Sequence, residues 1–264
     1  MLPASKSEPL ARGLIGAVDR ALDILNLFDS RTPELGTTEI AEATGLHKST
    51  AAGLIYTLAA KGYLTQNPHN RKYRLGLKLV ERAAIVLGSM DLRRVALPYL
   101  QQLRDTFNES VNLAILDGGY MVYVERVLGT RALGMRSEVG KREPAHSTAL
   151  GKAILSCWKP AEVAAYVERY GLRKMTPRTV VDPAVFLGQV AEARRLGYAL
   201  DDEENEEGGR CVAAPVFDHV GQPIAAISIS APTARLALED VPQVGVQVRA
   251  AALAISASLG YVPR

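Results

Sequence analysis

The sequence predicts an α+β protein of two domains: a small basic domain of helices and a hairpin, then a larger α/β domain with a mainly antiparallel sheet. Helical periodicity dominates residues 16–62, and strand-like alternation follows at 63–75. From residue 91 onward, strand-like and helical runs are mixed. With 264 residues, the chain is long enough for two domains.

A loop separates the first two helices expected in the small domain. Apolar residues recur at helical spacing over about 16–29. Pro33 and Gly36 mark the loop that follows. Thr37 is a suitable N-cap for a second, short helix, and Glu39 in its first turn suits the helix dipole.

A third helix follows after only Gly45 and Leu46, and it ends at Gly62. Two helices joined by so short a turn are typical of a helix-turn-helix, in which the first turn of the second helix meets base edges in the major groove of DNA. The apolar face of this helix is formed by Ala51, Leu54, Ile55 and Leu58, and the opposite face by Lys48, Ser49, Ala52, Gly53 and Tyr56.

A basic hairpin completes the small domain. Residues 63–66 and 71–75 alternate around an Asn-Pro-His-Asn turn. In the second strand, Lys72 and Arg74 point to the side opposite the apolar residues. Three helices and a two-stranded wing make a winged helix-turn-helix domain, which we expect over residues 16–76.

The rest of the chain is predicted to contain a linker helix over 77–90 and an α/β domain over 91–264. Residues 1–15 lack a long apolar run, and we expect them to form a disordered arm. In the larger domain we expect strands at 111–116, 119–127, 132–138, 210–217 and 223–230, and helices at about 92–107, 147–156, 160–169, 183–195 and 239–259.

The basic charge lies in the N-terminal third. Residues 1–90 contain 11 Lys and Arg against 8 Asp and Glu, a net +3, whereas 91–264 contain 20 against 20. Because no acidic residue occurs from Ala43 to Val80, duplex DNA is the natural partner of this surface, the alternative being a packing module with a solvated basic face. The residues expected to contact DNA are Thr38, His47, Lys48, Ser49, Thr50, Tyr56, Arg71, Lys72 and Arg74.

The segment 146–152 of the larger domain opens a helix. The free first-turn N–H groups near Ala149 and Leu150 are able to bind a carboxylate. Gly151 permits close packing of this helix. Ser147 is as well suited to capping the helix as to contacting a ligand.

A second indication of a ligand pocket lies in the strand expected at 223–230. Its period-two alternation places Ser228 and Ser230 on one face, which is otherwise small and apolar. Two hydroxyls on such a face are suited to orienting a ligand. Cys211 lies on a neighbouring strand, where an isolated buried cysteine usually acts as a small apolar side chain.

The run from Asp201 to Glu207 contains six carboxylates in seven residues. Adjacent side chains in a loop diverge, and no histidine-rich shell accompanies them, so we expect a solvated loop over the pocket with Asp201 turned inward, not a metal or acid–base site. Cys157 and Cys211 have no zinc or disulfide spacing, and we expect no cofactor or metal.

The start of the chain has no secretory signal, and its longest low-charge stretches are too short to cross a bilayer. Two cysteines far apart are consistent with a reducing compartment. We therefore expect a cytoplasmic protein that does not interact with a membrane.

From about Ala17 to the C-terminus the chain resembles the IclR family of bacterial transcriptional regulators. The small domain matches through AVDRALDILNLF, TTEIAEATGL, HKSTAAGLIYTLAAKGYL and YRLG. The larger domain matches through PAHSTALGKAIL, GYALDDEENEEGGRCVAAPVFD and IAAISISAP. The resemblance implies a homodimer built through the small domains and linker helices, often paired into a tetramer, on a palindromic operator. It also implies a GAF-like effector-binding domain.

The resemblance also implies which residues hold the effector, a small organic acid. They are Met135, Ala149, Leu150, Asp201, Cys211, Ser228 and Ser230. His146, which precedes the helix start, is expected to contact the effector as well and to favour a carboxylate. The chain departs from the family where Ala52 and Gly53 replace larger polar or basic residues, and where Ala149 replaces a common glycine. Base reading then depends on Lys48 and its neighbours or on DNA shape.

The sequence is therefore interpreted as a ligand-responsive, DNA-binding transcriptional regulator and not an enzyme. One alternative is an architectural DNA-binding protein whose larger domain only oligomerises. The other is a cysteine hydrolase that uses Cys211 and His146, although no nucleophile elbow surrounds the cysteine.

Overall fold

The computed structural model describes the chain except residues 1–13, 30, 89–90, 132–134, 136–137 and 263–264. The chain forms two compact units, residues 1–89 and 90–264. We call them the head and the body. The predicted arm 1–15 lies almost entirely outside the described residues.

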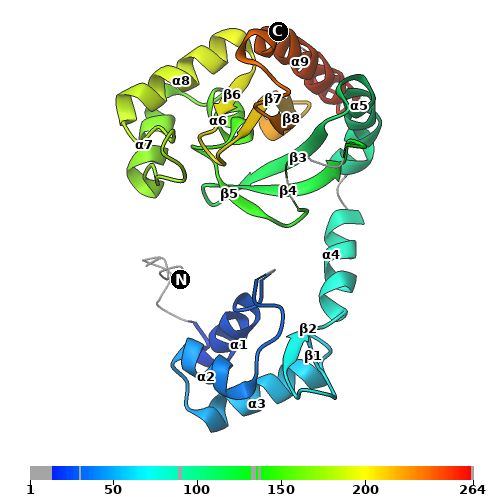
Figure 1. Ribbon diagram of the computed structural model, residues 1–264, viewed down its shortest axis with the longest axis vertical. Coiled ribbons are helices and arrows are strands. Elements are labelled where there is room, and N and C mark those ends of the chain that lie inside the picture. Colours follow the sequence, from blue (N-terminus) through cyan, green and yellow to red (C-terminus); the bar gives the residue numbers. More distant parts are fainter. Residues whose placement is uncertain (1–13, 30, 89–90, 132–134, 136–137, 263–264) are drawn as a thin grey trace. The chain divides into compact units, whose positions relative to one another are not determined.

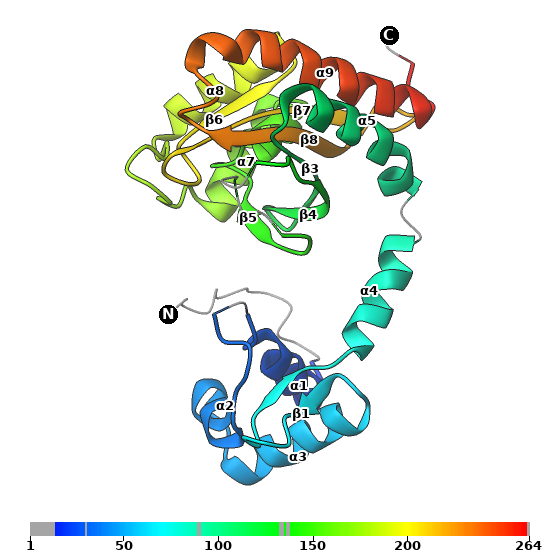
Figure 2. The ribbon, with the colours of Figure 1, turned by 45° about the vertical axis from the view of Figure 1, so that its right-hand side comes forward.

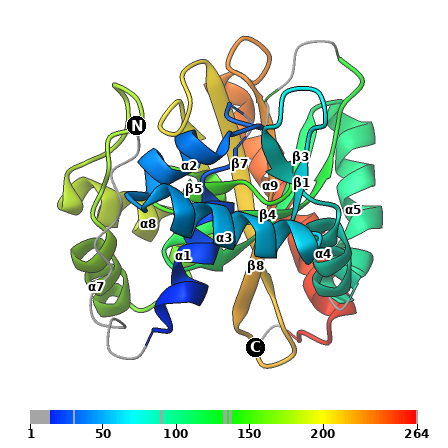
Figure 3. The same ribbon diagram turned by 90° about the horizontal axis from the view of Figure 1, so that it is seen from below.

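The head is a three-helix unit with a two-stranded wing and a further helix after it. Helix α3 packs against both α1 and α2 (Figure 3). Ile24, Ile40 and Ile55 are fully or almost fully buried between the three helices. The elements are α1 (Gly16–Asn26), α2 (Thr37–Thr44), α3 (Lys48–Ala60), β1 (Leu64–Gln66), β2 (Tyr73–Leu75) and α4 (Lys78–Gly88).

The head differs from the prediction in several details, and strand β2 begins at Tyr73 instead of residue 71. Helix α1 ends at Asn26 instead of residue 29. The N-cap of α2 is Gly36 and not Thr37, because the Glu39 carboxylate accepts the Gly36 N–H at 2.6 Å and satisfies the helix start from inside the first turn. As predicted, the turn into α3 contains Gly45, whose φ of +68° is a conformation that glycine adopts without strain.

The body is built on one six-stranded sheet in the order β5-β4-β3-β8-β7-β6. All neighbouring strands are antiparallel, which confirms the predicted sheet type. Its strands are β3 (Ser110–Asp117), β4 (Tyr120–Val127), β5 (Arg142–Pro144), β6 (Ala199–Asp202), β7 (Gly209–Phe217) and β8 (Pro223–Pro232).

Helices cover both faces of the sheet. Helices α5 and α9 lie side by side on one face (Figures 1 and 2). Helices α6 and α8 lie on the other face, with α7 packed on α8. Alternating strand residues therefore enter two cores, one on each side. The helices are α5 (Asp91–Phe107), α6 (Ala149–Leu155), α7 (Pro160–Tyr170), α8 (Pro183–Leu196) and α9 (Val241–Ser258), with a 3₁₀ turn at Leu238–Asp240.

The prediction missed the short strands β5 and β6. Strand β6 begins with two apolar residues and ends with two acidic ones, so its sequence carries no clear alternation. The strand expected at 132–138 falls mainly outside the described residues, and Met135 and Glu138 there are not in a strand. Within the described part of the chain, none of the helices combines the length and the apolar character that a bilayer crossing requires.

Candidate functional site

The first turn of α3 presents polar side chains to solvent. Lys48, Ser49 and Thr50 are exposed, and Tyr56 further along the helix is 75% exposed. His47 is the N-cap, and its Nδ1 accepts the Ser49 N–H at 3.4 Å. The helix start is therefore held in place by one of the residues predicted to contact DNA. Thr38 is exposed on α2.

The wing is tied to acidic residues that the sequence interpretation did not place there. Lys72 Nζ lies 2.9 Å from Glu39 Oε1. Glu34 accepts hydrogen bonds from Asn67 and Asn70 at 3.0 and 2.8 Å. These amides lower the pKa of Glu34, and the Gly36 N–H and Lys72 lower that of Glu39. Residues 43–80 contain no acidic residue, but Glu34 and Glu39 from outside this segment lie against the wing. The surface of the wing is therefore not free of acidic side chains.

Arg71 and Arg74 are the other basic residues predicted on the wing, and both are exposed. Arg71 has a φ of +61° in the turn, and its carbonyl accepts the Gln66 side-chain amide at 2.9 Å. Arg74 has no ion pair within the described residues. It is therefore more available to a phosphate than Lys72 is.

Helix α6 is held close to the backbone that precedes it. Thr148, not Ser147, is its N-cap, and Thr148 Oγ accepts the Gly151 N–H at 3.1 Å. Ser147 instead donates to Asn205 Oδ1 at 2.9 Å. A Cβ at Gly151 would lie 2.1 Å from the carbonyl oxygen of Ala145, so only glycine fits this position.

Strand register places the polar residues of the body in rows across the sheet. Asp201 pairs with Cys211, and Cys211 pairs with Ser230. In the next row, Ala213 pairs with Ser228. Side chains in such rows share one face. The alternation predicted for β8 is confirmed, because Ser228 and Ser230 line a pocket while Ile227 and Ile229 enter the opposite core.

These rows and the start of α6 line a small pocket of about 30 Å³. Seven of the eight residues predicted for the effector line it: Met135, Ala149, Leu150, Asp201, Cys211, Ser228 and Ser230. Sequence reasoning missed the other lining residues, Tyr123, Lys141, Glu143, Thr148, Asn205, Glu206 and Gly209. Tyr123, Lys141 and Glu143 come from other segments, and only the fold brings them to the pocket, whereas the remaining four are close along the chain to predicted residues.

The eighth predicted residue, His146, does not line the pocket. Its Nε2 lies 2.8 Å from the Arg173 carbonyl oxygen, and its ring packs edge-on against Phe186. Burial lowers the pKa of His146. The imidazole is thus a neutral packing group beside α6, and the geometry does not support a contact with the ligand.

Burial controls the chemistry of the two titratable residues in the rows. It raises the pKa of Asp201 from 3.8 to about 7, although Asp201 Oδ1 accepts the N–H groups of Glu204 and Asn205 at 2.8 and 3.2 Å. Burial, followed by the charge of Asp201, raises the pKa of Cys211 well above its ordinary value. Cys211 therefore remains a thiol, which is a poor nucleophile.

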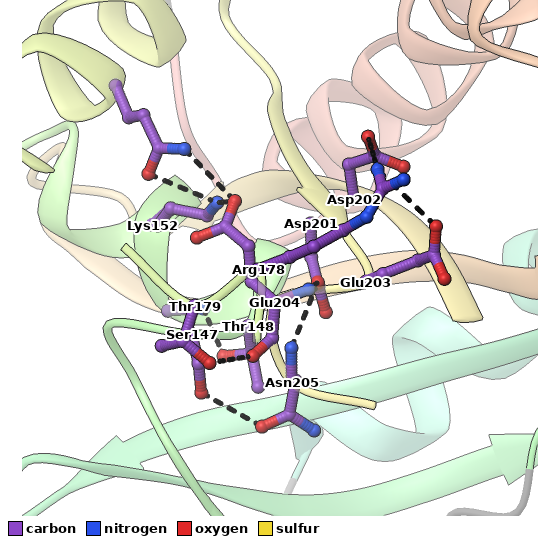
Figure 4. A network of polar contacts seen from close by, with 12 residues as sticks. Ser147, Thr148, Lys152, Arg178, Thr179, Asp201, Asp202, Glu203, Glu204 and Asn205 are labelled. Atoms are coloured by element: carbon purple, nitrogen blue, oxygen red, sulfur yellow. Dashed lines mark hydrogen bonds and ion pairs between the residues drawn. The ribbon is translucent and has the colours of Figure 1, made fainter. Parts of the chain in front are cut away.

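A buried ion pair behind the pocket was not predicted. Lys152 Nζ lies 2.5 Å from Glu204 Oε1 (Figure 4). Gln189 donates to the same oxygen at 3.0 Å. Thr179 donates to the Glu204 carbonyl at 2.6 Å. The acidic run is thus not only a solvated loop: Asp201 points inward as expected, but Glu204 is buried as well.

No group of three or more His, Cys, Asp or Glu side chains is arranged to hold a metal ion in the part of the chain that the structure describes. The pocket instead contains hydroxyls, a thiol, the Asp201 carboxyl with its raised pKa, the charged side chains of Lys141, Glu143 and Glu206, and the N-terminal end of α6. Such a set suits reversible binding of a small polar molecule.

Comparison with known protein families divides the chain into the same two parts, the head and the body. The model of the IclR helix-turn-helix domain matches residues 17–68, and that of the bacterial transcriptional regulator IclR C-terminal domain matches 84–257. The HTH-type transcriptional regulator XynR of Escherichia coli (strain K12) is 43% identical over 248 residues, which cover 94% of this chain and 98% of XynR.

Two solved structures are also similar along their whole length. A transcriptional regulator from Rhodococcus sp. RHA1 has a TM-score of 0.82 and 31% identity, covering 93% of this chain and 98% of its own. An IclR homologue from Microbacterium hydrocarbonoxydans, complexed with 4-hydroxybenzoate, has a TM-score of 0.80 and 27% identity, covering 92% and 98%.

The head therefore is a DNA-binding domain and the body a ligand-binding domain, as in relatives named as regulators and not as enzymes. The hydrolase alternative is excluded on that ground, and the buried thiol of Cys211 agrees with it. The chain belongs to the IclR family of bacterial transcriptional regulators.

Proposed function

We propose that this regulator senses a small organic acid in the pocket of the body and binds a palindromic operator through its head, as a homodimer or a dimer of dimers in the cytoplasm. The observation that carries the proposal is the row of Asp201, Cys211 and Ser230 beside the start of α6. The relative with bound 4-hydroxybenzoate supports the choice of an acid.

Hydrogen-bond donors lie at the start of α6 and on strand β8, whereas Glu143 and Glu206 add acceptors elsewhere in the lining of the pocket. The first N–H groups of α6 have no carbonyl partner inside the helix. Ser228 and Ser230 add hydroxyls from the sheet. Asp201 is able to add a proton near neutral pH, since burial raises its pKa to about 7. A carboxylate can accept hydrogen bonds from all of these groups.

Binding of an acid is expected to weaken above pH 7. A bound carboxylate favours the protonated form of Asp201, whose pKa of about 7 means that the proton is present below this pH and lost above it. The affinity for the acid should thus be nearly independent of pH around pH 6. Well above pH 7 it should fall by up to about tenfold per pH unit. The Asp201→Asn variant, which keeps the acceptor for the Glu204 N–H, should bind with little pH dependence.

Calorimetric titration of the full chain at pH 6.0–8.5 measures this effect. The probes are pyruvate, 4-hydroxybenzoate and D-galacturonate, which represent keto, aromatic and sugar acids. If the affinity does not change with pH in either the wild type or the Asp201→Asn variant, the role assigned to Asp201 is contradicted. If the wild type binds none of the acids, the proposed ligand class is wrong.

On DNA, we propose that the first turn of α3 enters the major groove while the wing contacts the flanking phosphates. The exposure of Lys48, Ser49 and Thr50 supports this arrangement. A dimer would place two such helices on half-sites one helical turn, about 34 Å, or a multiple of it apart.

Arg74→Ala is expected to change the salt dependence of DNA binding more than Lys72→Ala. Loss of one phosphate contact should reduce the slope of log affinity against log salt by about 0.9. Lys72 already neutralises Glu39 at 2.9 Å, so its net contribution to counterion release should be smaller. Fluorescence anisotropy on a duplex from the region upstream of the protein's own gene, at 50–300 mM salt, compares the two. A larger change for Lys72→Ala would refute this ranking.

Self-association through the head is supported by apolar residues that lie in solvent. Leu14, Ile15, Val18 and Leu22 are exposed in and before α1. Leu77, Val80 and Ile85 are exposed in and before α4. A second copy of the chain would remove both faces from water. We further propose that the linker, residues 77–90, transmits the effect of the bound acid from the body to the head.

A further inference from the structure

Asn112 is a buried polar residue of β3 that does not line the pocket. Asn112 is 1% exposed, and it pairs with Ser228 of the neighbouring strand β8. Because neighbouring residues in a sheet row share a face, its side chain lies on the same face as the pocket serines. Burying an amide is costly unless it is hydrogen-bonded, so its partners show what it does.

The Asn112 side chain donates to both serines of the pocket. Its Nδ2 lies 3.3 Å from Ser228 Oγ and 3.1 Å from Ser230 Oγ. An amide nitrogen only donates, so both hydroxyl oxygens must accept. Each hydroxyl then keeps its single proton for a different partner.

Among the described residues, little can accept those two protons. None of the described residues accepts a hydrogen bond from Ser228, and the group within reach of Ser230 is the Cys211 sulfur, a weak acceptor. Both serines line the pocket. Their protons are therefore available to a molecule bound there.

We propose that Asn112 is a positioning residue that sets Ser228 and Ser230 as hydrogen-bond donors and thereby makes the pocket select a carboxylate over the corresponding amide. The proposal rests on the acid-binding function proposed above. A carboxylate only accepts, and it matches the hydroxyls of Ser228 and Ser230, which donate. The NH₂ group of an amide placed against Ser228 and Ser230 would meet two donors and remain unpaired there, which is unfavourable in a buried site.

Two substitutions test the role of the Asn112 amide. In Asn112→Asp, the introduced carboxylate accepts the serine protons and turns them away from the pocket. Acid affinity should fall by about 100-fold, the equivalent of one or two hydrogen bonds to a charged group. In Asn112→Ala, the hydroxyls are free to rotate and no charge is added. The ratio of acid to amide affinity should fall by about tenfold.

The measurement is calorimetry on the full chain with three pairs of probes: pyruvate and pyruvamide, 4-hydroxybenzoate and 4-hydroxybenzamide, and D-galacturonate and its amide. Asn108→Asp is the matched control, because it adds the same charge just before the same strand, where Asn108 Oδ1 accepts the Thr130 N–H. It should leave both affinities unchanged. Thermal unfolding without ligand shows whether each variant is folded.

The outcomes separate the two proposals. If the wild type binds no acid, the proposed ligand class fails and this inference fails with it. If the wild type binds an acid but both Asn112 variants keep the acid-to-amide ratio, this inference alone is overturned. A ratio that changes in Asn112→Asp but not in Asn112→Ala would indicate charge repulsion and would also overturn it.

Discussion

Lys152→Met is expected to destabilise the body by about 3–5 kcal/mol, the usual cost of removing one partner from a buried ion pair. The side chains of Lys152 and Glu204 are 2% and 6% exposed, and their charged atoms are 2.5 Å apart. Without the ammonium group, the Glu204 carboxylate would be left buried beside only the Gln189 amide. Its Oε2 already has no hydrogen-bond partner among the described residues.

Chemical unfolding of the full chain measures this loss. The chain has one tryptophan, Trp158, which lies just after α6, so its fluorescence reports on the body. The double variant Lys152→Met with Glu204→Leu is the control, because removing both charges leaves no uncompensated ion. It should be more stable than Lys152→Met alone. A single variant within about 1 kcal/mol of the wild type would contradict the assigned role of the pair.

Gly151→Ala is expected to be at least as disruptive as overpacking in a well-filled core, which costs about 1–3 kcal/mol. The added Cβ would lie 2.1 Å from the Ala145 carbonyl oxygen and 2.3 Å from the Ala145 Cα, and both are backbone atoms that cannot rotate away. Helix α6 would have to move, and the pocket residues Ala149 and Leu150 would move with it.

Gly188→Ala provides the matched control in the same domain. Gly188 is inside α8, and a Cβ there meets nothing within 4 Å. Because alanine favours a helix interior over glycine by about 1 kcal/mol, this variant should be slightly more stable than the wild type. Equal unfolding midpoints for the two variants would show that the contact with Ala145 does not determine the effect.

The elements that the sequence predicted well are those defined by local spacing. Two helices separated by Gly45 and Leu46 need no distant contact to be recognised. The alternation that places Ser228 and Ser230 on one face is also a property of a single strand. The order of motifs along the chain then sufficed for the family.

Contacts between distant segments could not be predicted in the same way. Lys72 and Glu39 are 33 positions apart, and Lys152 and Glu204 are 52 positions apart. Nothing local indicates that either pair meets. His146 was assigned to the ligand because it precedes α6, but the direction of its side chain depends on Phe186 and the Arg173 carbonyl.

The sequence alone also could not decide which of two adjacent residues caps a helix. Ser147 and Thr148 both have hydroxyls suited to an N-cap, and the backbone at Thr148 decides which one caps α6. Gly36 and Thr37 present the same problem at α2, where the Glu39 side chain compensates for the missing cap hydroxyl. Such one-residue shifts matter because they decide which side chain remains available to the pocket or to DNA.

The central claim is that an acid bound in the body changes how the head binds DNA. The most direct measurement titrates the acid that binds most tightly into a complex of the full chain with a duplex from upstream of its own gene. The wild type should change its DNA affinity, whereas Ser228→Ala with Ser230→Ala should bind DNA normally and not respond. A wild-type protein that binds the acid in calorimetry but keeps the same DNA affinity would contradict the claim.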